Sequence, residues 1–313
     1  VFIDGAALCE KHLSGVGHVA LETIRALVKD DKFMATHQII LIVTHKNSHQ
    51  LDRYDFDESI KVKRVPLPAK VWNALNRFDI VPWADLLFGR GIYVFPNFRN
   101  WRLLHSKSIT YIHDIAFILH PETISPRNLT YLKKNVCNWV KRTNRVVTVS
   151  QSSKQEIVKH FGLSQAIVSV VPNAVDGSVY YGRSKEVVDR AVKHIGIRGD
   201  YVLFVGNIEP RKNLPNLIEA FSSIPVSERS NTELVIVGAG GWLNEEVVSS
   251  LAEATRKGAR VIRPSFFVIS RELKKPDLNR TERNRLHKFA LHHGWADSAY
   301  LLEEIIYHLE KRS

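Results

Sequence analysis

Short apolar runs recur along this chain, and helical patterns such as GHVALETIRALVKD and SKQEIVKHFG separate most of them. Helices that alternate with strands connect parallel strands and cover both faces of the sheet. The pattern therefore predicts an α/β fold built on parallel sheets. The expected strands lie at residues 1–3, 39–43, 92–95, 108–114, 145–150, 167–172, 201–206, 233–238 and 260–264.

The series of expected strands is interrupted between residues 177 and 200. The first series ends in VVPNAVDG, the charged stretch RSKEVVDRAVKHIGIRGD follows, and a new strand begins at Tyr201. A chain of 313 residues is long enough for two cores. We therefore expect two doubly wound, Rossmann-like domains, residues 1–180 and 181–290. They would face one another across a cleft and hold ligands at the carboxyl ends of their strands.

The net charge of +12 calls for an anionic partner. Nucleic acid, an anionic membrane surface or a phosphorylated substrate would each suit it. The cations are spread along the chain and no nucleic-acid-binding module is recognisable, so we expect no nucleic acid partner. No apolar stretch approaches the roughly 20 residues that cross a bilayer, and no secretory signal is evident. Cys9 and Cys137 stand far apart, which favours two reduced thiols in a cytosolic protein.

The segment GNIEPRKN, residues 206–213, places two cations behind a proline where an expected strand gives way to a helical pattern. One interpretation is a solvated turn that caps the helix. The other is an anion site, because a helix N-terminus offers free backbone N–H groups and the positive end of a dipole. Arg211 and Lys212 would then add their charges. The turn alone leaves both interpretations open.

Two strand ends in the first half of the chain carry residues suited to a ligand. Gly15 and Gly17, in SGVGH, would let phosphates reach backbone amides, although a glycine-rich helix start is as often only a turn. His113 and Asp114, in IHDIAF, follow the strand that begins near residue 108. The histidine could act on a ligand there, or it could be a satisfied loop residue.

Two further strand ends have an adequate structural explanation. VVTVSQSSK ends a strand in Ser150, which with Ser153 can cap the next helix. VPNAVD puts Asn173 and Asp176 into a turn, where such side chains bond the backbone. Neither segment needs a ligand to explain it.

The order of these segments carries more information than any one of them. SGVGH, IHD, TVSQSSK, VPNAVD, GNIEPRKN and LVIVG follow one another as they do in retaining glycosyltransferases of family 4, which have the GT-B fold. The chain resembles this family over roughly its first 260 residues, and EPRKN is the most specific match. The resemblance implies that Arg211 and Lys212 bind the diphosphate of a nucleotide-sugar donor. It also implies that Gly15 and Gly17 donate amides and that His113 faces the donor sugar.

The resemblance also predicts the ending of the chain and further site residues. HHGWADSAYLLEEIIYHLEK, within residues 291–313, resembles the family's closing helix, which crosses back onto the first domain. Its apolar residues recur at helical spacing, which predicts packing. His292 and His293 are expected to cover this helix rather than to bind a metal. The residues expected to line the cleft are Asp114, Ser150, Asn173, Asn207 and Glu209.

One segment of the family pattern has no counterpart in this chain. Family members usually carry a segment like PSxxEGFGLPxLEAMA, whose two glutamates contact the donor sugar and the ribose. Glu245 and Glu253 have the same spacing, but they lie in NEEVVSSLAE, where an exposed helical face explains both. We therefore expect the second domain to be incomplete in this sequence.

The resemblance implies a specific reaction. A hexose, mannose by the IEPRKN match, would move with retention from a nucleotide-diphosphate sugar such as GDP-mannose to a hydroxyl of a polysaccharide or glycolipid precursor. The alternative is a non-catalytic partner or regulator of the same fold that lacks the donor-site glutamates. We expect no cofactor and no metal, because no His, Cys or carboxylate cluster has metal-site spacing. We expect a cytoplasmic protein that could contact the inner face of the membrane.

The stretch VPLPAKVWNALNRFDIVPWADLLFG, residues 65–89, mixes aromatic, cationic and proline residues. Its aromatic residues could belong to the core under a long connection. They could instead form an amphipathic surface that meets a lipid-linked acceptor or an anionic bilayer. The residues concerned are Trp72, Phe78, Trp83 and Phe88, with Lys70 and Arg77.

Overall fold

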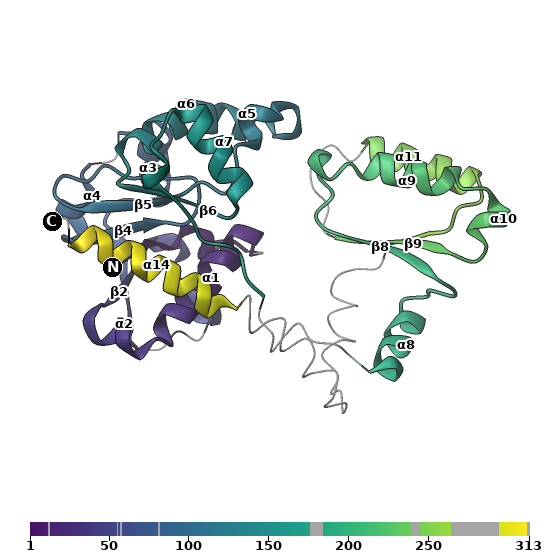
Figure 1. Ribbon diagram of the computed structural model, residues 1–313, viewed down its shortest axis with the longest axis horizontal. Coiled ribbons are helices and arrows are strands. Elements are labelled where there is room, and N and C mark those ends of the chain that lie inside the picture. The colour runs from purple at the N-terminus through teal and green to yellow at the C-terminus, as the bar shows by residue number, and fades with distance from the viewer. Residues whose placement is uncertain are drawn as a thin grey trace. The chain divides into compact units, whose positions relative to one another are not determined.

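The structure, a computed structural model, describes residues 1–11, 13–54, 56, 58–80, 82–175, 184–238, 245–263 and 294–311. The chain divides into two compact units (Figure 1). The first comprises Val1–Leu119, Pro126–Gly177 and Phe289–Ser313, and the second comprises His120–Ser125 and Ser178–Lys288. Each unit has a parallel sheet and its own apolar cores, so the α/β fold class is confirmed.

The first unit is built on a seven-stranded sheet in the order β3-β2-β1-β4-β5-β6-β7. All six neighbouring pairs are parallel. This order winds outward from β1 in both directions, so the carboxyl ends of the strands share one edge. The strands are β1 (Phe2–Asp4), β2 (Ile39–Thr44), β3 (Ile60–Val65), β4 (Ile92–Phe95), β5 (Lys107–Tyr111), β6 (Arg145–Thr148) and β7 (Val168–Val170).

Helices connect these strands and cover both faces of the sheet (Figure 1). One face carries α1 (Gly15–Val28), α2 (Asp31–Thr36) and α14 (Trp295–Glu310). The other helices are α3 (Ala69–Arg77), α4 (Ala84–Phe88), α5 (Ala116–Leu119), α6 (Pro126–Arg142) and α7 (Gln151–Phe161). Short 3-10 helices are η1 (Gly5–Cys9), η2 (His45–Tyr54), η3 (Pro121–Thr123) and η4 (Gln165–Ile167).

Alternate residues of the strands enter two separate cores, because successive side chains of a strand point to opposite faces. Ile3, Leu41 and Val94 belong to the core that includes α1 and α14. Their neighbours Phe2 and Ile42 belong to a second core that includes α3, α4 and Trp101. The two cores explain why these strands read as continuous apolar runs.

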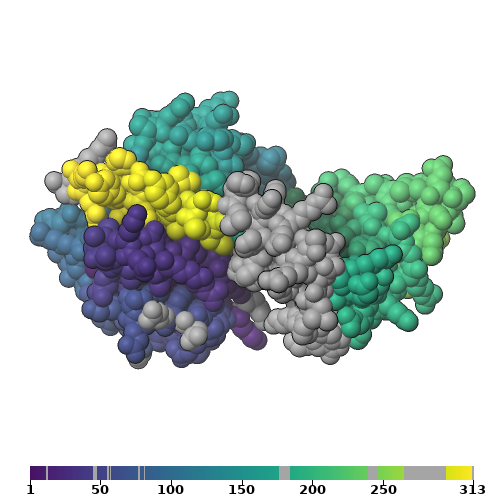
Figure 2. Space-filling model, turned by 60° about the horizontal axis from the view of Figure 1, so that its bottom comes forward, coloured from purple at the N-terminus to yellow at the C-terminus, as the bar shows by residue number. Residues whose placement is uncertain are grey.

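The last helix of the chain packs on the first unit, as the resemblance predicted. Helix α14 lies against α1, and Figure 2 shows its surface beside the N-terminal segments. Ala299, Leu302 and Ile306 are buried in the core that contains α1. Lys107 Nζ donates to Leu309 O at 2.7 Å, and Ser298 Oγ donates to Pro172 O at 2.7 Å. These contacts join the chain's end to β5 and to the loop after β7.

The second unit has a three-stranded parallel sheet in the order β10-β9-β8. Its strands are β8 (Tyr201–Val205), β9 (Glu233–Val237) and β10 (Val261–Ile262). Helices α9 (Leu214–Ser223) and α11 (Glu245–Arg256) pack together with one face of the sheet in a core around Leu234 and Ile236. Further elements are α8 (Lys185–His194), η5 (Pro210–Lys212) and α10 (Val226–Arg229).

Two glycines bring the ends of β8 and β9 close together. The Gly206 N–H donates to Val237 O at 2.9 Å, and a Cβ on Gly238 would lie 1.8 Å from Gly206 O. No side chain fits at position 238 with this backbone. The glycine that ends the LVIVG strand therefore has a packing function, and it fixes the backbone from which the 206–213 turn departs.

Strand β3 was missed by the sequence pattern. Its sequence, IKVKRV, exposes four of six residues, because β3 is an edge strand of the described sheet. Its two lysines and one arginine interrupt any apolar run, although charged side chains are a common feature of edge strands. The described residues contain no helix that is both long and apolar enough to cross a membrane.

Candidate functional site

The glycine segment lies at the N-terminus of α1, as predicted. Ser14 caps this helix, and its Oγ accepts a hydrogen bond from the Gly17 N–H at 3.3 Å. A Cβ on Gly17 would approach Leu13 Cδ1 to 2.5 Å and Ala7 O to 2.9 Å, whereas a Cβ on Gly15 would meet nothing within 4 Å. Gly17 is therefore explained by packing. Gly15 is open, which is the property that a ligand contact at a helix N-terminus requires.

Arg53 fixes the loop that leads to this helix, and no sequence motif predicts this role. Its guanidinium donates to three backbone carbonyls of the loop, those of Leu8, Glu10 and Lys11. Tyr54 Oη donates to Leu8 O as well, at 2.8 Å. These bonds tie η2 to the backbone just before the glycine segment. Only the folded chain brings them together, because 42 to 46 residues separate the partners.

His113 follows the carboxyl end of β5 and is buried, with 9% of its surface exposed. Its Nε2 lies 2.8 Å from Pro96 O. Because a carbonyl oxygen only accepts, Nε2 carries the proton, and Nδ1 of the neutral ring is left as an acceptor. Thr148 Oγ1 donates to His113 O at 3.2 Å, which ties the ends of β5 and β6 together. The histidine is thus held firmly at both its ring and its backbone.

Burial lowers the pKa of His113 below 6.5, although the Pro96 carbonyl and the Asp114 carboxylate favour the charged form. The ring is therefore neutral near pH 7. Phe98 lies beside it, with ring centroids 5.8 Å apart, and has a positive φ of 31°. Backbone strain at a bulky residue often accompanies a functional site. The Pro96 carbonyl satisfies Nε2, and Nδ1 is not one of the buried atoms that lack a hydrogen-bond partner, so both interpretations of His113 remain.

The other predicted residues of the first unit differ in what the structure shows for them. Asp114 Oδ1 accepts from the Ala116 N–H at 3.0 Å, at the start of α5. Ser150 caps α7 by accepting from the Ser153 N–H at 3.1 Å, so its structural interpretation is confirmed. Asn173 is exposed in the loop after β7. Asp176 lies outside the described residues.

A partly buried ion pair at the end of β1 was not predicted. Arg99 Nη1 lies 3.3 Å from Asp4 Oδ2, and the carboxylate also accepts from the Ala6 N–H at 3.1 Å. Both side chains line a small cavity of about 40 Å³, which Thr44 and Trp101 also border. Parallel topology therefore brings β1, β2 and the loop after β4 to the same edge as His113. Neither residue belongs to a pattern that sequence could reveal.

In the second unit, the cationic turn follows β8. Pro210, Arg211 and Lys212 form η5, and Asn213 then adopts the left-handed conformation with φ 52° before α9 begins. In the part of the chain that the structure describes, no side chain caps η5 or α9. Among the described residues, the first N–H groups of α9 have no side-chain acceptor. A solvated turn and an anion site both remain consistent with this backbone.

The two cations of this turn differ in their partners. Arg211 Nε donates to Glu209 Oε2 at 2.8 Å, so much of its charge is balanced within the turn. Lys212 is exposed and forms no ion pair with any residue that the structure describes. A Cβ at Gly206 would lie 3.8 Å from Lys212 Cε, which shows that the lysine stem lies along the glycine. Asn207 is exposed beside them.

Glu245 and Glu253 both lie on α11, as the sequence predicted. Glu253 pairs with Arg256 and Lys257 on the same helix, and Glu245 is exposed. An exposed helical face therefore accounts for them. The described residues contain no group of three or more His, Cys, Asp or Glu that could hold a metal ion. His292 and His293, and the polar run at 271–285, lie outside the described residues.

The aromatic residues of 65–89 divide between the two interpretations. Trp72 and Phe88 are 1% and 3% exposed and belong to the core around Trp101. Phe78 and Trp83 are 57% and 46% exposed. The core interpretation therefore holds for the first pair, and the second pair belongs to a surface.

Models of known families match both units of the chain. The model described as Glycosyltransferase Family 4 matches residues 13–178, more than half of the chain. The chain belongs to this family. A second model, Glycosyl transferases group 1, matches residues 189–268. The match to the first model covers the glycine segment, His113 and Ser150, and the second covers the cationic turn.

Curated relatives are similar to parts of the chain. The O-antigen chain mannosyltransferase B of Escherichia coli is 28% identical over 177 residues, which cover 56% of this chain and 46% of the relative. The serotype-specific mannosyltransferase WbdA of Escherichia coli is 24% identical over 138 residues, or 42% of this chain and 16% of that protein. The chain thus spans less than half the length of these relatives.

Solved structures share the fold. Anabaena HepE, crystallised with UDP-glucose, is 18% identical with a TM-score of 0.52 over 85% of this chain and 68% of that one. WaaG, described as a glycosyltransferase involved in lipopolysaccharide biosynthesis, is 13% identical with a TM-score of 0.53 over 84% and 69%. Sucrose-phosphate synthase from Thermosynechococcus elongatus is 12% identical with a TM-score of 0.58 over 87% and 72%. These neighbours support a fold of two Rossmann-like domains.

Proposed function

We propose that the chain transfers a hexose, with retention of configuration, from a nucleotide-diphosphate sugar to a hydroxyl of a polysaccharide or glycolipid precursor. Membership of Glycosyltransferase Family 4 supports transfer of a sugar. The names of two similar relatives, both mannosyltransferases, favour mannose and hence GDP-mannose as the donor. The UDP-glucose complex of HepE makes a UDP-sugar the alternative donor.

The observation that carries this proposal is the cationic turn after β8. Lys212 is exposed without an ion-pair partner among the described residues, and the α9 N-terminus beside it lacks a capping side chain. Both features suit a diphosphate, which needs a cation and N–H donors. Negative charge grows on the leaving phosphate as the glycosidic bond breaks, so a fixed cation there accelerates the reaction as well as binding the donor.

We assign His113 the role of orienting the donor sugar. Its Nε2 proton is committed to Pro96 O, so the neutral ring offers Nδ1 as an acceptor for a sugar hydroxyl. The departing phosphate oxygen can itself take the proton of the acceptor hydroxyl. No side-chain base or nucleophile is then required, and no metal is needed where Lys212 and a helix terminus balance the phosphates.

Nucleotide binding provides the first test. The full chain would be heated with GDP, UDP or ADP, each at about 100 times its dissociation constant, where binding stabilises the fold by about 2.7 kcal/mol. Transfer would then be assayed with the matching labelled sugar nucleotide and a lipid or polysaccharide extract, and the product's anomeric configuration read by NMR. Stabilisation by GDP with transfer from GDP-mannose is expected. Stabilisation by UDP alone would contradict GDP-mannose as the donor and indicate a UDP-sugar instead.

The alternative function, a non-catalytic partner or regulator, makes a different prediction. The glutamate segment usual in this family has no counterpart in the sequence, which is the observation that favours it. Such a protein could bind a nucleotide without transferring sugar. Stabilisation by a nucleoside diphosphate without turnover of any sugar nucleotide would support the alternative and contradict the proposed transfer.

We also propose that the surface around α3 and α4 contacts an anionic membrane. Its exposed apolar side chains are Val71, Phe78, Ile80, Trp83, Leu86 and Leu87, each at least 44% exposed. Lys134 Nζ lies 5.0 Å from the Phe78 ring centroid and adds positive charge. Co-sedimentation with anionic vesicles at low salt, reduced in a Phe78→Ser/Trp83→Ser variant, is expected. Equal binding to neutral and anionic vesicles would remove charge as the cause.

A further inference from the structure

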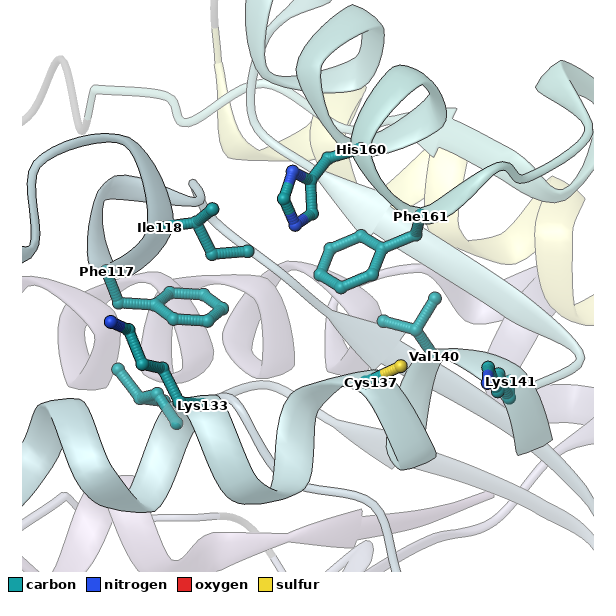
Figure 3. A pocket seen from close by; sticks show the side chains of 9 residues that line it. Phe117, Ile118, Lys133, Cys137, Val140, Lys141, His160 and Phe161 are labelled. Atoms are coloured by element: carbon teal, nitrogen blue, oxygen red, sulfur yellow. The ribbon is translucent and has the colours of Figure 1, made fainter.

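A pocket in the first unit lies among α5, α6 and α7, and none of the proposed donor-site residues lines it (Figure 3). Its volume is about 490 Å³, within the range of about 300 to 1,000 Å³ typical of small-molecule sites. The residues that line it are Phe117, Ile118, Leu132, Lys133, Cys137, Val140, Lys141, His160 and Phe161.

The floor of the pocket is apolar. Phe117 and Val140 are 2% and 1% exposed, and Figure 3 shows the Phe117 and Phe161 rings on opposite sides of the space. The Phe117 ring also contacts Phe98 edge to face, with centroids 6.3 Å apart, and that contact holds the floor in place. A rigid apolar floor with an open top suits a hydrocarbon chain.

The rim of the pocket is cationic. Lys133, Lys141 and His160 border it, all three are exposed, and no carboxylate lines it. None of these three side chains forms a hydrogen bond or ion pair with another residue that the structure describes. The charge of the rim is therefore available to an external anion, in contrast to Arg211, which Glu209 already balances.

The charge of the rim belongs to a wider pattern on α6. This helix contains five basic residues and no Asp or Glu: Arg127, Lys133, Lys134, Lys141 and Arg142. Arg142 pairs with Asp79 at 2.7 Å, and Lys134 lies over the Phe78 ring. The two lysines at the pocket have no such partner. Opposite charges three or four residues apart stabilise a helix surface, and α6 has no acidic residue with which to form such pairs.

We propose that this pocket binds an alkyl chain that ends in a phosphate group. The chain would lie on Phe117, Val140 and Phe161, and the phosphate would meet Lys133, Lys141 and, when protonated, His160. The proposal goes beyond sugar transfer and does not depend on it, because none of these residues belongs to the proposed donor site. A free phosphate ion would use only the rim, whereas a phosphorylated chain would use rim and floor together.

Cys137 offers a direct measure of occupancy. It is exposed at the pocket, and Figure 3 shows its sulfur beside Val140. The other cysteine, Cys9, is buried, and burial, with the nearby Asp4 carboxylate, raises its pKa to about 11 despite the opposing Arg53 charge. Iodoacetamide should therefore modify Cys137 selectively, because the thiolate is the reactive form. A bound chain should slow that modification.

The experiment measures the rate of Cys137 alkylation in the full chain, by peptide mass spectrometry, with decyl phosphate below its micelle concentration. Inorganic phosphate, decyl maltoside and decyltrimethylammonium are the comparison probes. Decyl phosphate is expected to protect at the lowest concentration. Shortening the chain to octyl should raise the half-protecting concentration by about fourfold for each methylene that is buried.

Two variants test the rim. Lys133→Gln/Lys141→Gln should raise the half-protecting concentration of decyl phosphate about tenfold, at two- to fivefold for each exposed charge pair. Lys159→Gln, on α7 but outside the pocket, should leave it unchanged. Equal protection by decyltrimethylammonium or decyl maltoside would overturn the charge argument. Equal protection by inorganic phosphate would overturn the apolar floor, and protection by none of the probes would overturn the site.

Discussion

Substitution of Lys212 separates the two interpretations of the cationic turn. Two unit charges 4 Å apart interact by about 1 kcal/mol in water and about 4 kcal/mol at an effective dielectric constant of 20. Lys212 is exposed, so the lower part of this range applies and Lys212→Ala should weaken nucleoside diphosphate binding by about 1 to 2 kcal/mol. Since 1.4 kcal/mol is a tenfold change, the dissociation constant should rise about 5- to 30-fold.

The assay is isothermal titration of GDP and UDP into the full chain at two ionic strengths. Glu209→Gln removes a negative charge from the same turn and frees the Arg211 guanidinium, so it should tighten binding about two- to fivefold. Lys257→Ala removes an equal charge from the end of α11, where the lysine pairs with Glu253, and should leave binding unchanged. Added salt should weaken the wild type more than Lys212→Ala.

Unchanged nucleotide affinity in Lys212→Ala, with an unchanged free energy of unfolding, would refute the reasoning. The turn would then be a solvated connection with no ligand. Weaker binding in both Lys212→Ala and Lys257→Ala would also count against it, because a change of net charge alone would then explain the effect.

Three other predictions follow from the same structure. His113→Ala should lower the transfer rate without removing a limb of the pH–rate profile, because burial keeps the ring neutral and its Nε2–H donates to Pro96 O. The free energy of unfolding of the wild type should fall as pH is lowered from 6.5 through the lowered folded-state pKa of His113. Gly238→Ala should lower the free energy of unfolding by about 3 kcal/mol or more in urea titrations, whereas Gly15→Ala, with no atom within 4 Å, should be nearly neutral. Burial would raise the pKa of Asp85, but three backbone N–H donors outweigh burial and lower it. The stabilising effect of the Asp85 carboxylate should therefore be complete above its unfolded pKa of about 3.9 and be lost as pH falls through the folded value. Asp85→Asn should cost about 2 kcal/mol of unfolding free energy at pH 7 and should reduce the loss of stability at acid pH.

Most of the architecture was predictable because it rests on local patterns. Strands buried on both faces read as apolar runs, and all nine expected runs coincide with strands that begin within one residue of the predicted start, such as Ile92–Phe95 and Tyr201–Val205. Strand β3 escaped because an edge strand can carry lysine and arginine on both faces. The charged stretch at 183–200 contains α8. The sequence pattern marks this stretch only as an interruption between two series of strands, and its helix was not predicted.

The candidate site was predictable only where chemistry follows a short motif. The turn at 206–213 and the position of His113 were evident from sequence. The hydrogen bonds of Arg53 to the loop before α1 and the ion pair of Asp4 with Arg99 were not evident from sequence, because 42 or more residues separate the partners in each case. The packing function of Gly238 was also hidden, since its constraint comes from the carbonyl oxygen of Gly206, which directly follows β8 and lies 32 residues earlier in the chain.

The position of α14 has a consequence for how the protein is made. The first unit ends its long N-terminal segment near residue 177, yet Leu302 and Ile306 complete the core that contains α1. At about 5 to 20 residues per second, the ribosome needs roughly 6 to 25 seconds to synthesise the intervening chain. During that interval, while the second unit is synthesised, the apolar residues on the α1 side of the core stay exposed to solvent. The segment synthesised first therefore finishes folding last, and a chaperone that binds apolar surface is expected to contact the nascent chain before α14 arrives.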